Sequence, residues 1–551
     1  MLSEKKITIK EIVFAFLVST LLLLICTKSS PLYPMNDWTD VNCIYTMGKA
    51  INNGMVIYRD VFDHKGPVLY FLFAIADIIS SDSALGLWIF EVICVAGFMF
   101  FTIQSSKLLV KNPKVIYFAL PFMVLFLLTS NSFTHGGSTE ELALFPLSYS
   151  FYYFLRLSKN HKIHVTEHIL NGVCFAIVFW MKFTMVALYL GAYLFVVIYV
   201  LFKKENRLIV PTLYSALGFF AISAVILLYF AANGALKDLW DVYFYGNIFT
   251  YTEDSSFVNK LVLMVKRVIA VPFSNTLFFL PIYISFVMMV IKKKTNMLPT
   301  LITFFLTMCL LYMGGARVYY PIVMAVYFSL GIWAMEEIYE KLKTKKALLW
   351  IVGVLFYVGC IYVANDRLTA LPAIAFIFFV SVFIATKVFS RSRGNESDDT
   401  VRRMLITRGT SSAVIAANVI LVFLMSFPMG NNTYLLEYEK EDMPQYKFAE
   451  IINAKEDATL LNYGFLDGGF YFASGVMPSN KYFYRSNLVT PELLEEQDYI
   501  IENHKADFVV TRIDSPNQKV IDAGYVCVAQ VSHIYLGQSV EFFLYQLPTS
   551  N

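Results

Sequence analysis

Long apolar runs follow one another through the first 428 of the 551 residues and then stop. A helix needs about 20 apolar residues to cross the hydrocarbon core of a bilayer, with roughly 17–25 as the working range. Thirteen runs are candidate membrane helices, centred on 11–27, 84–104, 115–129, 143–157, 168–181, 184–202, 209–231, 269–291, 297–313, 319–335, 347–364, 368–389 and 410–428. The pattern therefore predicts an α-helical polytopic membrane protein with about 13 transmembrane helices.

One further apolar stretch, PVLYFLFAIADIIS at 67–80, is short for a span and opens on Pro67. Its placement follows from the lysines and arginines, which are enriched in short cytoplasmic loops. If 67–80 only dips into the outer leaflet, 25 basic residues of the first part lie inside and 11 outside. If it crossed the membrane, every connection from Lys107 onward would lie outside. The sequence thus predicts a juxtamembrane helix in the first outer loop and a cytoplasmic amino terminus.

Residues 429–551 have a different composition. They carry 8 Lys/Arg against 17 Asp/Glu, a net charge of −9, which leaves +12 on residues 1–428. Their short segments alternate between helix-like and strand-like patterns, namely QYKFAEIIN, ATLLNY, PELLEEQDYIIENH, DFVVTR, GYVCVAQV and EFFLYQL. We predict a transmembrane domain at 1–428 and a small extracytoplasmic α/β domain at 429–551.

The overall composition excludes several classes of protein. The chain is 57% apolar and 15% charged, whereas soluble domains are about 45–50% apolar and about 25% charged. Its basic charge lies in short membrane loops rather than on a folded soluble face, which excludes a nucleic-acid partner. The sequence has no G-x-x-x-x-G-K-[ST] loop, and its inner connections are too short for a nucleotide-binding domain. We therefore expect the chemistry on the outer side of a multi-pass plasma-membrane protein.

The first outer loop, at 36–67, concentrates charged side chains beside the membrane surface. Its sequence is NDWTDVNCIYTMGKAINNGMVIYRDVFDHKGP, and a short helix is predicted over KAINN. A carboxylate in such a loop can take a proton from an incoming hydroxyl, while a cation stabilises a phosphate leaving group. A solvated loop with local Asp–Arg pairs is the alternative interpretation.

This loop also carries a family pattern. The segment DVN, followed by YTMGKAINNGMVIYRDVFDHKGP directly after the first membrane helix, resembles the polytopic glycosyltransferases of the C-superfamily. These include bacterial enzymes similar to the protein mannosyltransferases and to the aminoarabinose transferase of lipid A. The resemblance covers about residues 30–200. It implies transfer of a sugar from a polyprenyl-phosphate carrier to an acceptor on the outer side, with an acid of the first outer loop as catalytic base or acceptor-positioning group.

The resemblance also implies roles for individual residues. Asp40, eight residues before Gly48, matches the catalytic acid of the family, and Asp37 is its neighbour. Arg59 and Lys65 match residues placed against the carrier phosphate, and His64 between them is assigned to the acceptor. The Asp37-x-x-Asp40 spacing departs from the Asp-Glu or Asp-x-Asp form of some members. It therefore leaves a divalent metal open, and no other cofactor is predicted.

The second outer loop, SNSFTHGGSTEE at 130–141, supplies further candidates. Related sequences have an acid at this site, which makes Glu140 a second candidate catalytic acid, with Glu141 as an acceptor ligand. The alternative is that the two acids mark a helix amino terminus, where negative charge is favourable. His135 is expected to be a hydrogen-bonding loop residue.

Three other polar positions stand out against the membrane segments. Lys182 in WMKFTM interrupts an apolar stretch and is expected either to face the carrier phosphate or to snorkel. Arg317 and Tyr320 in GGARVYYP suit phosphate binding and sugar stacking, although tyrosines there equally suit the interfacial aromatic belt. Glu91, inside a span, is expected to be a hydrogen-bonded packing residue. The aromatic region 237–257 suits an acceptor groove or an amphipathic lid.

Two classes of function are compatible with these features. The leading hypothesis is an inverting glycosyltransferase that moves a hexose or pentose from a polyprenyl-phosphate donor to a cell-surface glycan or lipid-linked acceptor, such as wall polysaccharide or teichoic acid. The alternative is a transporter or flippase of lipid-linked saccharides, which would show paired repeats and broken spans with polar groups at the midplane. The charges here cluster in the outer loops, which favours surface chemistry.

Overall fold

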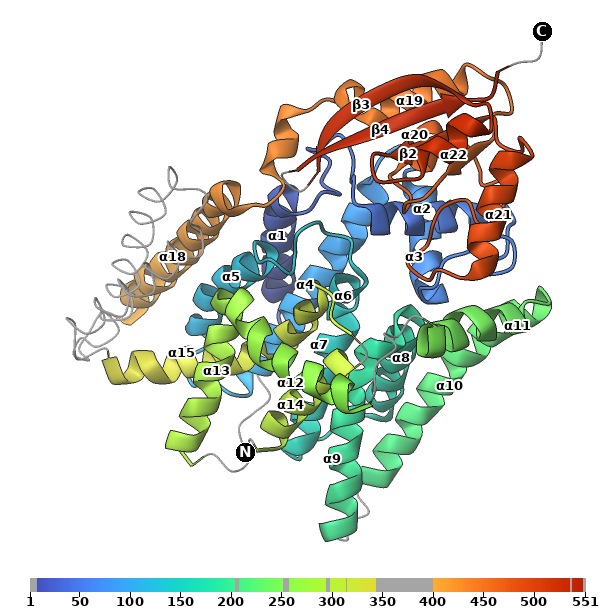
Figure 1. The fold of residues 1–551 in the computed structure, drawn as a ribbon. Helices are drawn as coiled ribbons and strands as arrows, with labels where there is room; N and C mark the ends of the chain where they lie inside the picture. Colours follow the sequence, from blue (N-terminus) through green and yellow to red (C-terminus); the bar gives the residue numbers. More distant parts are fainter. Residues whose placement is uncertain are drawn as a thin grey trace.

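The computed structural model describes residues 7–203, 208–250, 257–293, 298–313, 315–342, 400–535 and 538–548. In these ranges a bundle of helices carries a small sheet domain at one end (Figure 1). We call this end of the bundle the tail side. Two of the predicted spans, 347–364 and 368–389, lie outside the described residues.

The described part of the chain contains the following bundle helices. Their bounds are α1 (Ile9–Cys26), α2 (Thr39–Asn52), α3 (Pro67–Ile79), α4 (Leu85–Lys107), α5 (Lys114–Leu128), α6 (Thr139–Leu142), α7 (Leu144–Ser158), α8 (Val165–Met181), α9 (Ala187–Lys203), α10 (Ile209–Ala232), α11 (Leu236–Leu239), α12 (Phe257–Ser274), α13 (Thr276–Ile291), α14 (Leu298–Met313), α15 (Phe328–Leu342) and α18 (Thr400–Met429). Two 3₁₀ turns, η1 (Phe183–Val186) and η5 (Tyr320–Tyr327), precede α9 and α15, and a π-helix, η3 (Trp240–Thr250), continues α11.

The structure confirms a helical polytopic membrane protein. Five of the described helices are long and apolar enough to cross a bilayer, and a sixth crossing results if α12 and α13 form one bent span. Other predicted spans within the described ranges contain shorter apolar helices, such as α5, α8 and α14. The count of about 13 transmembrane helices stays a prediction.

Two local features differ in shape or bounds from the predicted pattern. The run 269–291 is not one straight span, because α12 and α13 meet at an angle of 111°. Pro272 lies in the last turn of α12, where it lacks an N–H donor, and the Asn275 side chain donates to the Val271 carbonyl at 3.2 Å, so the helical hydrogen-bond pattern ends there. The short helix predicted over KAINN is the end of a longer helix, since α2 begins ten residues earlier, at Thr39.

Helices α2 and α3 form a pair at the tail side. Helix α3 covers the predicted juxtamembrane stretch 67–80 and begins with Pro67 at a position where a missing N–H costs nothing. It packs directly against Gly48 of α2, where a Cβ atom would lie only 2.6 Å from the backbone nitrogen of Ala74. Gly48 therefore allows the close approach that holds α2 against α3.

A second close helix contact joins α8 to α10. A Cβ atom on Gly172 would lie 1.7 Å from the Ser215 carbonyl oxygen, and one on Gly218 would lie 2.1 Å from the Ile169 carbonyl oxygen. Small residues at a crossing let two membrane helices approach to backbone contact. This contact orients α8, whose last residue precedes Lys182.

The C-terminal part from Gly430 onward, which we call the tail or the sheet domain, is a small domain with a mixed four-stranded sheet. Its elements are η7 (Thr433–Glu437), η8 (Lys440–Asp442), α19 (Pro444–Asn453), β1 (Leu460–Asn462), α20 (Phe470–Ser474), α21 (Pro491–Glu502), β2 (Phe508–Arg512), α22 (Asn517–Asp522), β3 (Val526–Tyr535) and β4 (Gln538–Gln546). The strand order is β1-β2-β4-β3, with β1 and β2 parallel and the other pairs antiparallel. The four predicted strands and the helices α19 and α21 are present, whereas α20 and α22 were not predicted.

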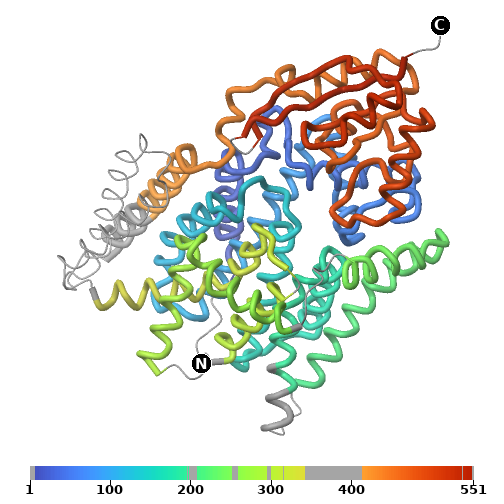
Figure 2. Tube along the Cα trace, viewed as in Figure 1, coloured from blue at the N-terminus to red at the C-terminus, as the bar shows by residue number. Residues whose placement is uncertain are grey.

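The sheet domain lies directly on the tail side of the bundle. Figure 2 shows its orange and red trace against the blue segment that holds α2 and α3. The Thr46 hydroxyl in α2 donates to Asp467 at 2.7 Å, and the backbone N–H of Phe62 donates to the Lys481 carbonyl at 3.0 Å. Asp467 also accepts from Asn462 and from the Gly469 N–H, so it is a buried docking residue.

The α8–α10 contact gives a test of the fold. We expect Gly172→Ala to destabilise the protein by about 2 kcal/mol, because the new methyl group meets backbone that must shift. Thermal unfolding in detergent measures this. The matched control is Gly191→Ala in α9, where the nearest atoms are 3.4–3.5 Å away and the change should be neutral or stabilising. Equal melting temperatures for the two variants would contradict the close crossing.

Candidate active site

Lys182 lies at the carboxyl end of α8 and is paired with Glu140. Its Nζ is 2.7 Å from Glu140 Oε1 and lies over the rings of Tyr320 and Tyr319, at 4.6 and 4.9 Å from their centroids. Burial acts to lower the pKa of Lys182, but Glu140 and the two tyrosines outweigh it and raise that pKa. Lys182 is therefore a permanent cation, placed by a carboxylate and two aromatic rings.

Asp40 and Lys65 lie beside this ion pair. Asp40 is in the first turn of α2, and its Oδ1 lies 3.8 Å from Lys65 Nζ. The residue after Lys65 is Gly66, whose N–H donates to the Met181 carbonyl at 3.1 Å. A Cβ atom on Gly66 would lie 2.1 Å from the Trp180 carbonyl oxygen. The first loop is thus held against the end of α8, immediately before Lys182.

Asp63 forms an ion pair with Lys65. Its Oδ2 lies 3.5 Å from Lys65 Nζ and accepts a hydrogen bond from the Tyr70 hydroxyl at 2.9 Å. Its Oδ1 accepts from the His64 N–H at 2.8 Å. Burial would raise the pKa of Asp63, but Lys65 and His64 lower it well below its usual range. Asp63 is therefore an ionised residue that positions Lys65, and sequence patterns gave no reason to separate it from the other acids of the loop.

Two carboxylate oxygens at this site accept no hydrogen bond from the described part of the chain. They are Asp40 Oδ1 and Glu140 Oε2, both buried. The charges of Asp40, Glu140 and Lys182 all act on the hydroxyl of Tyr319, whose pKa is raised by burial. The two acids and Lys182 therefore lie within electrostatic range of the Tyr319 hydroxyl. Buried acceptors without a donor carry a desolvation cost, which a ligand hydroxyl would relieve.

Glu141 is placed differently from Glu140. It is fully buried, and its Oε2 accepts from the Gly137 N–H at 2.8 Å. Burial and the neighbouring charge of Glu91 raise the pKa of Glu141 well above its usual value. Glu91 accepts from the Thr27 hydroxyl at 2.8 Å, as expected for a packing residue. Glu141 therefore lies beside Glu91 inside the bundle, away from the position expected for an acceptor ligand.

Asp37 does not face the same region as Asp40. It is ion-paired with Lys28, and His533 Nε2 lies 3.3 Å from its Oδ2. Burial would raise the pKa of Asp37, but Lys28 and His533 hold it at about 2. Both carboxylate oxygens have cationic or hydrogen-bonding partners, so the structure places Asp37 in a contact between the first loop and strand β3. Lys28 and His533 carried no sequence signal for this role.

The remaining candidates lie around the periphery. Arg59 is exposed, with Nε and Nη2 each 2.8 Å from Asp60 and Nη1 donating to the Asn233 carbonyl at 2.7 Å. His64 is buried against Asp63, with its Nδ1 at 3.1 Å from Asp63 Oδ1. Arg317 is exposed, two residues before Tyr319. Of the predicted residues, the structure thus brings together Asp40, Lys65, Glu140, Lys182 and Tyr320.

Within the described ranges, no three His, Cys, Asp or Glu side chains converge on a point that could hold a metal ion. The two acids of the D-x-x-D segment illustrate why. Asp37 contacts Lys28 and His533, whereas Asp40 lies beside Lys65. Each carboxylate has its own cationic partner, so the pair does not form a chelating site.

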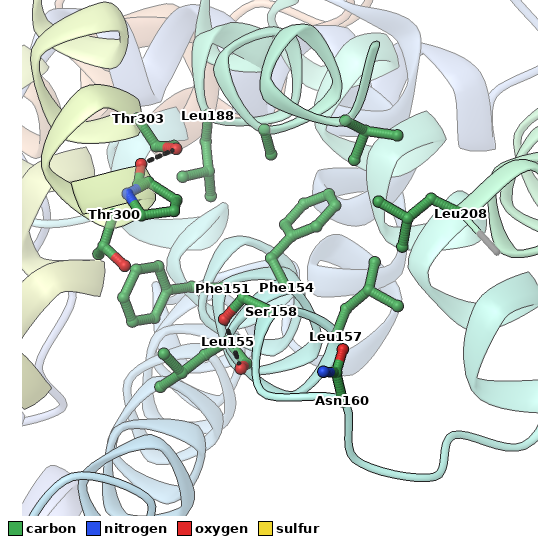
Figure 3. Close-up of a pocket in the computed structure, with 13 residues that line it drawn as sticks. Phe151, Phe154, Leu155, Leu157, Ser158, Asn160, Leu188, Leu208, Thr300 and Thr303 are labelled. Atoms are coloured by element: carbon green, nitrogen blue, oxygen red, sulfur yellow. Dashed lines mark hydrogen bonds between the residues drawn. The ribbon is translucent and has the colours of Figure 1, made fainter. Parts of the chain in front are cut away.

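An apolar cavity of about 250 Å³ lies between α7, α9 and α14. Phe151 and Phe154 point into it from α7, and Leu188 borders it from α9 (Figure 3). Its lining extends from Leu188, close to the Lys182 turn, to Val196 further along α9. The cavity is the size of a small part of a lipid chain and holds no charged side chain.

These features define a polytopic membrane protein whose buried acids and cations gather beneath a small sheet domain. No protein-family model matches the sequence, and no curated protein matches it. Among solved structures, the chain is similar to ArnT from Cupriavidus metallidurans bound to undecaprenyl phosphate, with a TM-score of 0.60, and to ArnT in the apo state, with a TM-score of 0.61. Both comparisons cover 97% of each chain at 12% identity.

A further similarity is to the archaeal oligosaccharyltransferase AglB from Archaeoglobus fulgidus in complex with an inhibitory peptide and a dolichol-phosphate. It has a TM-score of 0.42 and 12% identity, and covers 92% of this chain and 69% of that one. The near full-length match shows that the chain shares the fold of ArnT, and this confirms the fold expected from the first-loop resemblance.

The buried imidazole of His135 gives a pH-dependent prediction. Burial and the nearby Lys28 lower the pKa of His135 to about 3, from an ordinary value of 6.5. Between these values the unfolded chain binds a proton that the folded chain does not, so lowering the pH through 6.5 reduces the free energy of unfolding. We expect His135→Phe, which keeps a ring but cannot titrate, to lose about 1 kcal/mol less than the wild type between pH 7 and 5.5. Thermal unfolding at both pH values measures this, and identical pH dependence of the two proteins would contradict it.

Proposed function

We propose that this protein transfers a sugar from a polyprenyl-phosphate-linked donor to a hydroxyl of an acceptor, at the tail side of the membrane. The observation that carries the proposal is the pair of buried oxygens without hydrogen-bond donors, Asp40 Oδ1 and Glu140 Oε2, beside two lysines. Carboxylates next to fixed cations suit a reaction in which a hydroxyl loses a proton and a phosphate leaves. The likeness to ArnT bound to undecaprenyl phosphate supports this donor class.

In the proposed reaction, Asp40 Oδ1 accepts the proton of the acceptor hydroxyl. The hydroxyl oxygen forms a bond to the anomeric carbon of the sugar, and the bond between that carbon and the phosphate oxygen breaks. The phosphate leaves with the electron pair and the configuration at the carbon inverts. Lys182 and Lys65 stabilise the negative charge of the leaving phosphate, because both lie beside the acids without being fully buried. The proton on Asp40 then passes to solvent.

Glu140 has two functions in this scheme. Its Oε1 holds Lys182 at 2.7 Å, which fixes the cation, and its Oε2 is available to a hydroxyl of the donor sugar. The rings of Tyr319 and Tyr320 border the same cation and offer apolar faces to a sugar ring. Arg317, two residues before Tyr319, is a further cation that we propose for the donor phosphate.

The apolar cavity suits the isoprenoid chain of the donor. Leu188, which borders the cavity, lies two residues beyond the 3₁₀ turn that follows Lys182, and most of the cavity lining is apolar (Figure 3). A lipid with its phosphate at Lys182 would extend along α9 into this space. The head group would thus be bound at the end of α8 and the chain along α9, which follows it in the sequence.

We propose the following topology for this reaction. Residues 1–428 form the transmembrane domain with a cytoplasmic amino terminus, and residues 429–551 lie on the outer face. The acceptor would then be a cell-surface glycan or a lipid-linked glycan, reached from outside. The basic residues of the connections remote from the tail support this orientation through the positive-inside rule.

Replacing the proposed base separates chemistry from binding. We expect Asp40→Asn to lower sugar transfer by about 100-fold or more, the usual contribution of a general base, while undecaprenyl phosphate binds with unchanged affinity. Transfer is followed as incorporation of sugar into the cell-surface glycan, and binding is measured with the purified protein in nanodiscs. Asp514→Asn is the control, because Asp514 is exposed on the sheet domain and pairs with Arg512 at 2.6 Å. Normal transfer by Asp40→Asn would contradict the assignment.

Replacing the proposed phosphate ligand should instead weaken the binding of the lipid phosphate. We expect Lys182→Met to weaken undecaprenyl phosphate binding at least about tenfold, because the main cation is removed and Glu140 is left as a buried unpaired acid. The double variant Lys182→Met/Glu140→Gln removes that unpaired charge and should still bind weakly. Lys519→Met, at an exposed lysine of the sheet domain, is the control. Wild-type affinity in the double variant would show that the phosphate binds elsewhere.

A further inference from the structure

The end of strand β3 contacts both segments that carry the candidate acids. His533 and Tyr535 lie near the end of this strand, in the hairpin formed with β4. His533 reaches Asp37, three residues before Asp40, and Tyr535 reaches His135, five residues before Glu140. The C-terminal hairpin therefore connects two loops that are about a hundred residues apart in the sequence.

The first connection is a buried charge cluster. Lys28, Asp37 and His533 are 0%, 2% and 4% exposed, and the two ends of the Asp37–His533 contact are 496 residues apart. The tail also orients Lys28, since Lys28 Nζ donates to the Tyr434 hydroxyl at 3.0 Å and lies 5.1 Å from the Tyr535 ring centroid. A buried ion pair is costly to break when one partner is removed. The cluster therefore fixes the chain just before α2.

The second connection is a continuous series of ring contacts, of which the first two are stacked and the third is edge-on. The ring centroids of Tyr535 and His135 are 6.2 Å apart, those of His135 and Trp38 are 4.8 Å apart, and those of Trp38 and Tyr319 are 5.9 Å apart. Trp38 begins α2, because its carbonyl accepts from the N–H groups of Val41 and Asn42. Tyr319 in turn lies under Lys182. These ring contacts thus connect the tail to Lys182.

We propose that His533 and Tyr535 are positioning residues of the active site. The hairpin holds the start of α2, and with it Asp40, at a fixed place relative to the loop that carries Glu140. This inference rests on the proposed function for its catalytic consequence, but not for its structural one. The tail is then a component of the transfer site rather than a module that only carries an acceptor.

Other contacts keep the tail in place when the hairpin is altered. The Thr46–Asp467 hydrogen bond, the Phe62–Lys481 backbone bond and a 3.5 Å contact from Lys440 Nζ to the Asp82 carbonyl all lie away from β3. Loss of His533 or Tyr535 should therefore loosen the two acid-bearing loops without releasing the domain. This separation allows positioning to be distinguished from general stability.

The test compares His533→Leu and Tyr535→Ala with the wild type in the full-length protein. We expect the rate of transfer at saturating donor to fall at least about tenfold, while the Kd for undecaprenyl phosphate stays within about twofold. His533→Gln, which can still donate to Asp37, should recover most of the rate. Tyr499→Ala is the matched control, because Tyr499 is 45% exposed on α21 of the same domain.

Hydrogen exchange supplies a readout that does not depend on activity. In His533→Leu, amide exchange should accelerate in residues 36–46 and 130–142 and stay unchanged in residues 464–474, which hold the Asp467 contact. Unchanged exchange in both loops, or wild-type transfer by both variants, would overturn the proposal. Accelerated exchange throughout the tail, with loss of undecaprenyl phosphate binding, would show a general structural role and would also overturn it. If the wild type transfers no sugar, the proposed function fails, and the exchange data still decide the role of the hairpin.

Discussion

The Lys182–Glu140 ion pair is the interaction on which the arrangement of the site depends. Buried charges must be paired or hydrogen-bonded, because an uncompensated ion away from water costs several kcal/mol. This pair joins the end of α8 to the start of α6, and the Gly66–Met181 hydrogen bond adds the first loop to the same point. Asp63 then compensates Lys65. Charge compensation thus brings three distant segments to one place, and the carboxylate oxygens that it leaves unsatisfied face the region where a substrate would bind.

The bundle and the sheet domain depend on each other. Gly48 lets α2 approach α3, Gly66 lets the first loop approach the end of α8, and Gly172 and Gly218 let α8 and α10 approach each other. These contacts determine where the acids and cations can lie. The sheet domain covers α2 through the Asp467 and Asp37 contacts. Without that cover, a helix as polar as α2 would lie in water beside the membrane. The tail therefore explains how Asp40 is buried even though its helix is not part of a span.

Sequence patterns predicted the features that depend on neighbouring residues. The bounds of α1 and α3, the four strands of the tail and the fold of the first 200 residues followed from hydrophobic periodicity and from the first-loop motif. The features that failed depend on distant residues. Helix α2 is longer than KAINN because the tail buries its polar first turns. The sequence favoured Asp40 over Asp37 but did not predict the separate role of Asp37, because its partner His533 lies 496 residues away. The sequence predicted an acceptor role for Glu141, because it gave no sign that Glu91 lies beside Glu141 and Lys182 beside Glu140.

The central claim is that Lys182, Glu140 and Asp40 form one site for a lipid-linked phosphate. A cryo-electron microscopy structure of the full-length protein in nanodiscs with undecaprenyl phosphate tests it most directly. The account predicts phosphate density within hydrogen-bonding distance of Lys182 Nζ, on the side that faces Asp40, with the isoprenoid chain following α9 past Leu188. Phosphate density at another part of the molecule, with the Lys182–Glu140 pair unchanged and no ligand near Asp40, would contradict it.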